Sequence, residues 1–207
     1  MHANGDRTNR EVITVLEQLA ELRRRTESQS FMPPALSHRI EHAQMIRSED
    51  IQRLAGIARK KGFNVLECPV TGGVHLAHTG EITVLVGGDA DVFEQYKPIL
   101  EIMGKEVIHL GAIGHASVVK VVTNMLAFIH LVAAGEGMML AAKQGVDLEA
   151  AYRAIRASSG NSFVHETESQ VILNGSYNII FTMDLACKDL GFADQISDKL
   201  GVPLELG

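Results

Sequence analysis

Two polar side chains stand four residues apart in an otherwise apolar stretch. Lys120 and Asn124 follow the glycine-containing segment 111–114 and are flanked by valines and leucines. Residues at i and i+4 share one face of a helix, so an ammonium and a carboxamide would point into the same space. Burying such groups without partners is costly, which makes the pair a candidate site. The alternative is a lysine on a partly exposed helix that keeps its charge in water.

A second candidate is the tripeptide Thr71-Gly72-Gly73, which follows a short predicted strand. Two consecutive glycines leave backbone N–H groups unshielded, and the neighbouring hydroxyl completes a small nest for an anion such as a carboxylate. The alternative is a tight turn between two strands.

Lys188 is a third candidate, because it is expected in the first turn of the last predicted helix. The positive end of the helix dipole disfavours a cation there. A residue placed against such a local rule is a candidate for function. The alternative is a surface lysine paired with a neighbouring acid.

The histidines give weaker signals. The string at 38–42 reads H-x-x-E-H, the inverted zinc-protease motif. Its surroundings are polar and no third ligand has an obvious place, so chance spacing is favoured and we expect no metal site. His75 and His78 are expected in a solvated turn beside the glycine pair, with a place in the lining of a site as the alternative. His115 and His165 are expected to be structural or exposed, with a pocket role as the alternative.

Composition narrows the class of protein. The chain has 207 residues, 46% hydrophobic and 21% charged, with a net charge of −6. An acidic chain lacks the basic surface that nucleic acids require. Cys68 and Cys187 are isolated, so neither a disulfide framework nor a zinc site is indicated. The N-terminus lacks an apolar signal region and no apolar run is expected to reach bilayer length, so we expect a cytoplasmic protein without a membrane partner.

The first half predicts an α/β arrangement. Residues 1–47 differ in sequence pattern from the rest of the chain. They are expected to form a separate helical segment, with one helix over 10–28. From Ser48 onward the pattern is regular. It predicts helices over 48–61 and 89–103, and strands over 63–67, 81–86 and 105–110. The β-α-β alternation indicates part of an α/β sheet.

The second half predicts only helices. The longest covers 115–143 and is apolar on most sides, so it is expected to be buried against several neighbours. Further helices are predicted over 148–157, 163–173 and 184–200, with a polar loop over 158–162. The fold class is therefore α/β followed by all-α. The expected divisions are the N-terminal segment 1–47, a partial Rossmann-like domain over 48–112 and an all-α domain over 113–207.

Four ordered motifs resemble those of the β-hydroxyacid dehydrogenases, the relatives of 3-hydroxyisobutyrate dehydrogenase and 6-phosphogluconate dehydrogenase. They are Cys-Pro-Val-Thr-Gly-Gly at 68–73, the glycine-flanked strand at 80–88, Lys-Val-Val-Thr-Asn at 120–124 and Lys-Asp-Leu at 188–190. The likeness covers about residues 48–207. It implies the remnant of a Rossmann-type sheet, then a long interdomain helix, then a helical domain that often pairs with a second subunit.

The resemblance also implies a chemistry. Lys120 matches the catalytic lysine, which takes the proton of the substrate hydroxyl while hydride passes to NAD or NADP. Asn124 matches the asparagine that orients the substrate. Thr71, Gly72 and Gly73 match the loop that holds its carboxylate, and Lys188 matches a lysine close to the cofactor. For general-base work near neutral pH, desolvation must lower the pKa of Lys120.

The chain departs from the family pattern in three places. The G-x-G-x-x-G dinucleotide fingerprint is absent from the sequence. The threonine of a segment near the cofactor is replaced by Met45. The second glycine before the lysine is replaced in Gly114-His-Ala116. The chain also stops at Gly207, short of the family's last helices. We therefore expect a chain that lacks most of the cofactor domain. Three explanations stay open: a fragment, a gene whose start was assigned wrongly, and a degenerate copy.

The function expected from these residues is the oxidation of a small β-hydroxy acid with NAD or NADP. The expected enzyme is a homo-oligomer. An inactive fragment of such an enzyme is left open. The alternative is a non-enzymatic helical module that serves only assembly. Which hydroxy acid is used, and which of the two cofactors, does not follow from the sequence.

Overall fold

A computed structural model describes residue 14 and residues 48–176 and 181–206 of the chain. The predicted helix over 10–28, the histidine string at 38–42 and Met45 therefore lie outside the described residues, apart from the helical Thr14. The chain divides into two compact units, Met1–Val118 and Val119–Gly207. Each unit is described by itself.

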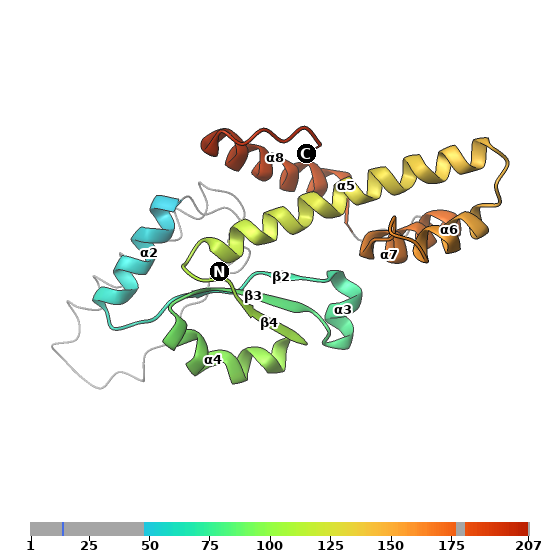
Figure 1. The fold of residues 1–207 in the computed structure, drawn as a ribbon. Coiled ribbons are helices and arrows are strands. Elements are labelled where there is room, and N and C mark those ends of the chain that lie inside the picture. Colours follow the sequence, from blue (N-terminus) through green and yellow to red (C-terminus); the bar gives the residue numbers. More distant parts are fainter. Residues whose placement is uncertain (1–13, 15–47, 177–180, 207) are drawn as a thin grey trace. The chain divides into compact units, whose positions relative to one another are not determined.

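The first unit contains a small mixed sheet (Figure 1). Its elements in chain order are α2 Ser48–Lys60, β1 Leu66–Glu67, β2 Val70–Thr71, α3 Gly73–Thr79, β3 Thr83–Gly88, α4 Ala90–Met103 and β4 Glu106–His109. Strand β3 is central. It pairs in parallel with β4, and in antiparallel fashion with β1 and β2. The predicted α/β pattern is thus confirmed for β3-α4-β4, where a helix connects two parallel strands.

Strands β1 and β2 are two pieces of one edge strand. Leu66 pairs with Gly88 and Val70 pairs with Val84, which is the same antiparallel register. Between the pieces, the carbonyl of Pro69 accepts a hydrogen bond from the N–H of Leu85 at 2.8 Å. Proline has no N–H to donate in return, so the ladder is interrupted there. The predictions of a strand over 63–67 and a loop over 69–73 were therefore wrong in their boundaries.

The core of this unit lies between β3 and α4. Val84 and Val86 are fully buried, and Phe93 and Leu100 of α4 pack against them. Helix α4 begins as predicted, because the Asp89 carboxylate accepts hydrogen bonds from two N–H groups of its first turn. The segment with His75 and His78 is helix α3 and not the turn expected from the sequence.

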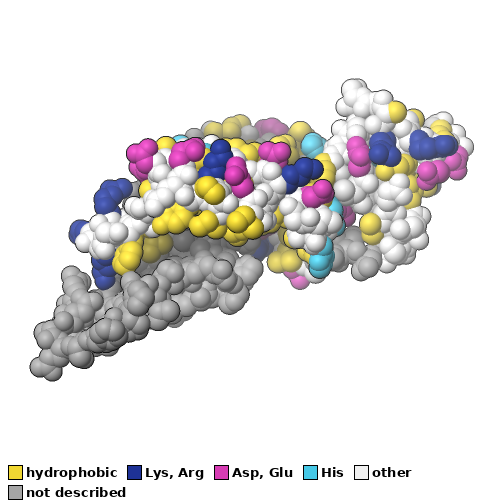
Figure 2. Space-filling view, turned by 90° about the horizontal axis from the view of Figure 1, so that it is seen from below, with side chains coloured by type: hydrophobic (Ala, Val, Ile, Leu, Met, Phe, Trp, Pro, Cys, Tyr) yellow, Lys and Arg dark blue, Asp and Glu magenta, His cyan; other side chains and the backbone are white. Residues whose placement is uncertain are grey.

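The outer face of α4 is partly apolar. Figure 2, which views the side of the molecule that carries α4, shows a row of hydrophobic side chains next to acidic and basic ones. Tyr96, Ile99, Ile102 and Met103 are exposed on this helix, and Ile102 is 85% exposed. Helix α4 is thus partly apolar both on the face toward the sheet and on its outer face. A helix that packs against one sheet needs an apolar face on that side only.

The second unit is helical in its described residues. Helix α5 spans His115–Lys143, the range predicted from the sequence, although its first four residues belong to the first unit. It is followed by α6 Leu148–Arg156, α7 Phe163–Leu173 and α8 Met183–Leu200. A small core joins Met138 of α5 to Ala151 and Tyr152 of α6.

Helix α5 is less buried than its sequence predicted. Among its residues only Ala116 and Met138 are buried, while Val118, Val122 and Val132 are between 41% and 62% exposed. An apolar helix is buried only where neighbouring elements cover it, and the described residues leave much of α5 uncovered.

By length and composition, α5 is also apolar enough to cross a membrane, with a mean hydropathy of 1.8 over its most apolar window. The expectation that no apolar run reaches that length was wrong. Length and composition alone do not separate such a helix from an apolar helix of a soluble protein.

Candidate active site

Lys120, Asn124 and Asp189 form a hydrogen-bonded chain in the second unit. The Nζ of Lys120 donates to Oδ1 of Asn124 at 2.9 Å, which confirms the predicted shared face of α5. The Nδ2 of Asn124 donates to Oδ2 of Asp189 on α8 at 2.7 Å. Asn124 therefore uses its acceptor toward the lysine and its donor toward the carboxylate, which fixes the orientation of its amide.

The surroundings of Lys120 lower its pKa. Burial is the larger cause, because removing the ammonium from water disfavours the charged form. The charge of Asp189 acts in the opposite direction and raises the pKa. Desolvation outweighs the charge, so the net direction is toward a lysine that gives up its proton more readily than a lysine in water.

Asp189 is the buried acid of this site. It is 8% exposed, and its second oxygen, Oδ1, lies 3.2 Å from Nζ of Lys188. Two cationic side chains and one amide thus surround one carboxylate. Asp189 compensates a positive charge in a partly dry site, which is the usual condition for a buried acid.

Lys188 lies in the second turn of α8 and not in its first, since the helix begins at Met183. Its ammonium pairs with Asp189 and also lies 5.7 Å above the ring centre of Phe192. The alternative from the sequence, a lysine paired with a neighbouring acid, is what the structure shows for the free chain. A cation held this way near a partly exposed surface can still meet an anionic ligand.

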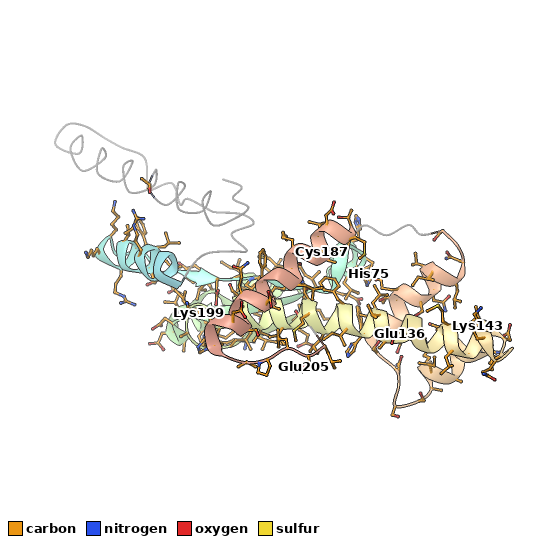
Figure 3. All side chains as sticks on the ribbon, turned by 90° about the horizontal axis from the view of Figure 1, so that it is seen from above. His75, Glu136, Lys143, Cys187, Lys199 and Glu205 are labelled. Carbon is orange, nitrogen blue, oxygen red and sulfur yellow. The ribbon has the colours of Figure 1, made fainter. Side chains whose placement is uncertain are left out.

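Some other polar side chains of these two helices lie at the surface. Figure 3 labels Glu136 and Lys143 on the second half of α5, and Cys187 and Lys199 on α8. All four are exposed. They are useful as matched controls, because they share helices with the site and make no hydrogen bond or ion pair to it in the described residues.

The Thr71-Gly72-Gly73 loop belongs to the first unit. Thr71 ends β2 and pairs with Thr83 of β3. Gly72 has φ +122° and precedes α3 without a side-chain cap. The positive φ requires glycine there, while a Cβ at Gly72 would lie 2.9 Å from Cδ1 of Leu76, a side-chain end that can move aside.

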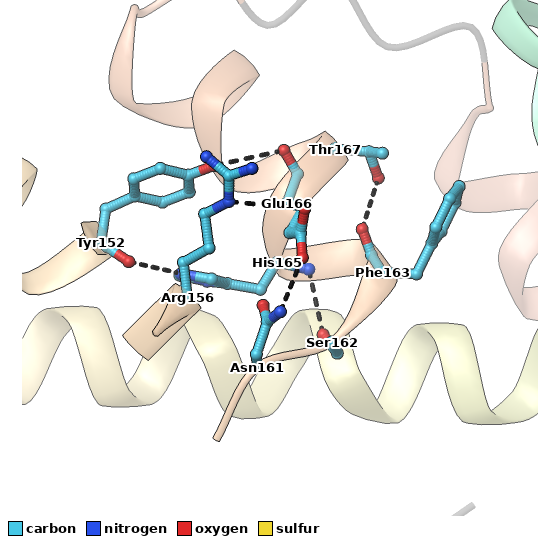
Figure 4. A network of polar contacts seen from close by, with 8 residues as sticks. All are labelled: Tyr152, Arg156, Asn161, Ser162, Phe163, His165, Glu166 and Thr167. Atoms are coloured by element: carbon cyan, nitrogen blue, oxygen red, sulfur yellow. Dashed lines mark hydrogen bonds and ion pairs between the residues drawn. The ribbon is translucent and has the colours of Figure 1, made fainter. Parts of the chain in front are cut away.

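His165 is a core residue and not a pocket residue. It is fully buried, with Nε2 3.2 Å from the carbonyl of Tyr152 and Nδ1 3.0 Å from the hydroxyl of Ser169. Figure 4 shows the polar contacts around it, in which Glu166 accepts from Asn161 and pairs with Arg156. Within the described residues, no three histidine, cysteine, aspartate or glutamate side chains are grouped to hold a metal ion.

The sequence did not identify Asp189 as a site residue. Its partner Asn124 is 65 residues away, and no local pattern connects a helix in the middle of the chain to one near its end. The available signal was indirect. Asp189 follows Lys188, the lysine predicted to stand against the helix dipole, and was therefore a candidate partner for a nearby cation.

Two family models match the chain. The one described as the NAD binding domain of 6-phosphogluconate dehydrogenase matches residues 10–114. The one described as NAD-binding of NADP-dependent 3-hydroxyisobutyrate dehydrogenase matches residues 114–207. The first match begins well before Ser48, where the motifs of the sequence place the start of the resemblance.

Curated relatives include 2-(hydroxymethyl)glutarate dehydrogenase of Eubacterium barkeri, 34% identical over 155 residues, which are 74% of this chain and 52% of the relative. L-threonate dehydrogenase of Escherichia coli K12 is 34% identical over 162 residues, 78% of this chain and 54% of the relative. The chain thus spans about half the length of the curated relatives it matches.

Solved structures also resemble the chain. A 3-hydroxyisobutyrate dehydrogenase of Salmonella typhimurium has a TM-score of 0.68 at 34% identity, covering 78% of this chain and 57% of that one. A Mycobacterium tuberculosis 3-hydroxyisobutyrate dehydrogenase with L-serine has a TM-score of 0.69 at 29% identity, covering 78% and 58%. The fold expected from the sequence, a Rossmann-type remnant followed by a long helix and a helical domain, is confirmed by these neighbours.

Proposed function

We propose, because this chain belongs to the β-hydroxyacid dehydrogenase family, that it acts in the NAD- or NADP-dependent oxidation of a small β-hydroxy acid. The observation that carries the proposal is the half-buried Lys120, whose pKa is lowered by burial and whose ammonium is bonded to Asn124. A lysine of this kind is suited to proton transfer near neutral pH.

Lys120 is the general base of the proposed reaction. Its free amine takes the proton of the substrate hydroxyl through Nζ, and the carbon that bears the hydroxyl loses a hydride. A lysine in water is protonated near neutral pH. Burial of Lys120 increases the fraction of free amine, which is the form that accepts a proton.

Asn124 orients the substrate beside Lys120 in this proposal. Asp189 holds the Asn124 amide in one orientation, so that its carbonyl oxygen faces the ammonium. Such fixed polar groups lower a barrier because they need no rearrangement during the reaction. Asp189 is therefore a positioning residue that acts through Asn124.

Thr71, Gly72 and Gly73 are proposed to hold the substrate carboxylate through the threonine hydroxyl and the glycine N–H groups. The positive φ of Gly72 supports this, because the backbone conformation exposes N–H groups that a side chain would otherwise shield. These roles follow from the family resemblance of the loop.

The residues of this chain fit a nicotinamide dinucleotide only in part. A bound NAD or NADP would supply the hydride acceptor. Lys188 is the cation proposed to face it, and its partly exposed ammonium is compatible with an anionic partner. The glycine fingerprint that receives a pyrophosphate is not in this sequence, so no residue of the chain is assigned to that group.

The substrate class is a small hydroxy acid, by analogy with relatives named L-threonate, 3-hydroxyisobutyrate and 2-(hydroxymethyl)glutarate dehydrogenases. We also propose that the protein is cytoplasmic and homo-oligomeric, binds no nucleic acid and has no membrane partner. The Rossmann-like part over 48–112 and the helical part over 113–207 are the proposed domains, after the N-terminal segment 1–47.

The direct test is turnover of the purified chain with L-threonate, 3-hydroxyisobutyrate and 2-(hydroxymethyl)glutarate, each with NAD and with NADP, followed by the absorbance of the reduced nicotinamide. Lys120→Met should lower kcat by at least about 100-fold, the usual contribution of a general base. Lys143→Met, which removes an exposed lysine from the same helix, is the control. Equal rates for wild type and Lys120→Met would refute the proposed role.

A second candidate function is a non-enzymatic helical module for assembly. The exposed apolar side chains of α5, such as Val122 and Val132, favour it. Titration with NAD and NADP separates the two functions, since binding of either with micromolar affinity contradicts the assembly module. Light scattering combined with size exclusion then gives the oligomeric state.

A further inference from the structure

The carboxylate of Glu67 contacts the segment that begins α5. Its Oε1 accepts hydrogen bonds from the N–H groups of Gly114 at 2.7 Å and Ala116 at 2.9 Å, and its Oε2 accepts from the hydroxyl of Ser117 at 2.6 Å. The first N–H groups of a helix have no partner within the helix. Glu67 supplies that partner from a strand 47 to 50 residues earlier in the chain.

The sheet leaves space for this carboxylate at Gly87. Glu67 of β1 and Gly87 of β3 are paired across the two strands. A Cβ at Gly87 would overlap the Glu67 carboxylate, and its distance to Cγ would be 2.8 Å. Directly paired residues place their side chains on the same face of a sheet, so the missing side chain at Gly87 is what allows the glutamate to reach the helix.

The electrostatics favour the same arrangement. The start of a helix carries partial positive charge, and an anion there is stabilising. Distances of 2.6–2.9 Å are those of charge-assisted hydrogen bonds, which are stronger than neutral ones. Glu67 is half-buried, so water competes less for its oxygens than at an exposed cap.

The helix held in this way is the one that carries Lys120 and Asn124. Ser117 precedes Lys120 by three residues, about one turn of α5. A helix whose first turn is fixed projects its next side chains in a defined direction, whereas a frayed first turn does not.

We propose that Glu67 is a positioning residue that fixes the first turn of α5 against β1 and thereby sets the direction in which Lys120 and Asn124 project. Its effect on turnover rests on the proposed function. Its effect on the helix does not, and the two are measured separately.

The test compares Glu67→Ala, Glu67→Gln and Gly87→Ala in the full chain. Glu67→Ala removes the acceptors, and Gly87→Ala puts a methyl group where the carboxylate lies. Glu67→Gln keeps an oxygen for both N–H groups and offers an amide to the Ser117 hydroxyl. Glu106→Gln, on an exposed strand residue of the same unit, and Gly56→Ala, where a Cβ meets nothing, are the controls.

Two readouts do not depend on turnover. Amide hydrogen exchange at Gly114 and Ala116 reports the first turn of α5, and should be at least about tenfold faster in Glu67→Ala and Gly87→Ala. The NMR titration of Lys120 reports its surroundings, and should move toward higher pH in both variants as the side chain becomes better solvated. Glu67→Gln should stay within about threefold of wild-type exchange.

Turnover is the third readout, and kcat/KM should fall by about tenfold or more in Glu67→Ala but not in Glu67→Gln. Wild-type exchange and wild-type Lys120 titration in both Glu67→Ala and Gly87→Ala would overturn the proposal. If Glu67→Ala does not fold, Gly87→Ala decides alone, and unchanged exchange and titration in that variant would overturn the proposal. Absence of turnover in wild type would instead refute the proposed function. Hydrogen exchange and the Lys120 titration would then still decide the positioning role of Glu67.

Discussion

Asn124 donates a hydrogen bond to Asp189 over 2.7 Å, although 65 residues separate them in the chain. This contact joins α5 to α8 within the second unit and leaves the amide oxygen of Asn124 for Lys120. A lysine on an apolar helix thus becomes part of a defined polar group, in which each hydrogen-bonding atom of Asn124 has an assigned direction.

Asp189→Asn should separate the charge of this residue from its shape. Asp189 raises the pKa of Lys120, so removing its charge lowers that pKa further. The free amine then forms at lower pH, and the acidic limb of the pH–kcat/KM profile should move to lower pH. The plateau rate should fall because the new amide no longer holds Asn124 with a charged acceptor. NMR titration of Lys120 checks the direction, with Asp194→Asn on an exposed acid of the same helix as control.

Lys120→Met should change the dependence of stability on pH. Because burial lowers the pKa of Lys120 in the folded chain, the unfolded chain binds more protons between that value and the ordinary lysine value of 10.5. The free energy of unfolding of wild type therefore rises through this interval, and the penalty for the buried charge is fully present below it. Any advantage of Lys120→Met should be largest below the lowered pKa of Lys120 and shrink toward pH 10.5, as measured by urea unfolding.

The comparison for that experiment is Lys143→Met, which removes a lysine from the last turn of α5. A difference between Lys120→Met and wild type that stays constant from neutral to alkaline pH would contradict the lowered pKa of Lys120.

Asn124→Ala should destabilise the second unit. It leaves the buried Asp189 without its amide donor, and an unsatisfied buried polar group costs about 1–3 kcal/mol. The double variant Asn124→Ala with Asp189→Asn should cost less than the sum of the two single changes, because both changes act on the same contact. Additive values in denaturant unfolding would show that the contact contributes nothing.

His165→Phe should behave as a core substitution. It removes the contacts to Tyr152 and Ser169, and we expect a loss of about 1–3 kcal/mol in the free energy of unfolding. The titration of Lys120 and the substrate KM should not change. A changed KM with unchanged stability would assign His165 to a pocket after all.

Local features of the sequence determined the helices and the pair on α5. The span of α5 follows from a long run of helix-forming and apolar residues between glycine-containing turns, and Lys120 and Asn124 share a face because of helical periodicity. The start of α4 follows from Asp89, whose carboxylate caps the next turn. These features depend on residues within a few positions of one another, which a sequence displays directly.

Tertiary structure decided the partners. Glu67 reaches the start of α5 across 47 to 50 residues, Asp189 reaches Asn124 across 65, and β1 and β2 share one register on β3. The burial of His165 and the exposure of Val122 likewise depend on which surfaces are brought together. Hydrogen bonds between distant residues leave no periodic trace in the sequence, because they are selected by the packing of whole elements and not by local propensity.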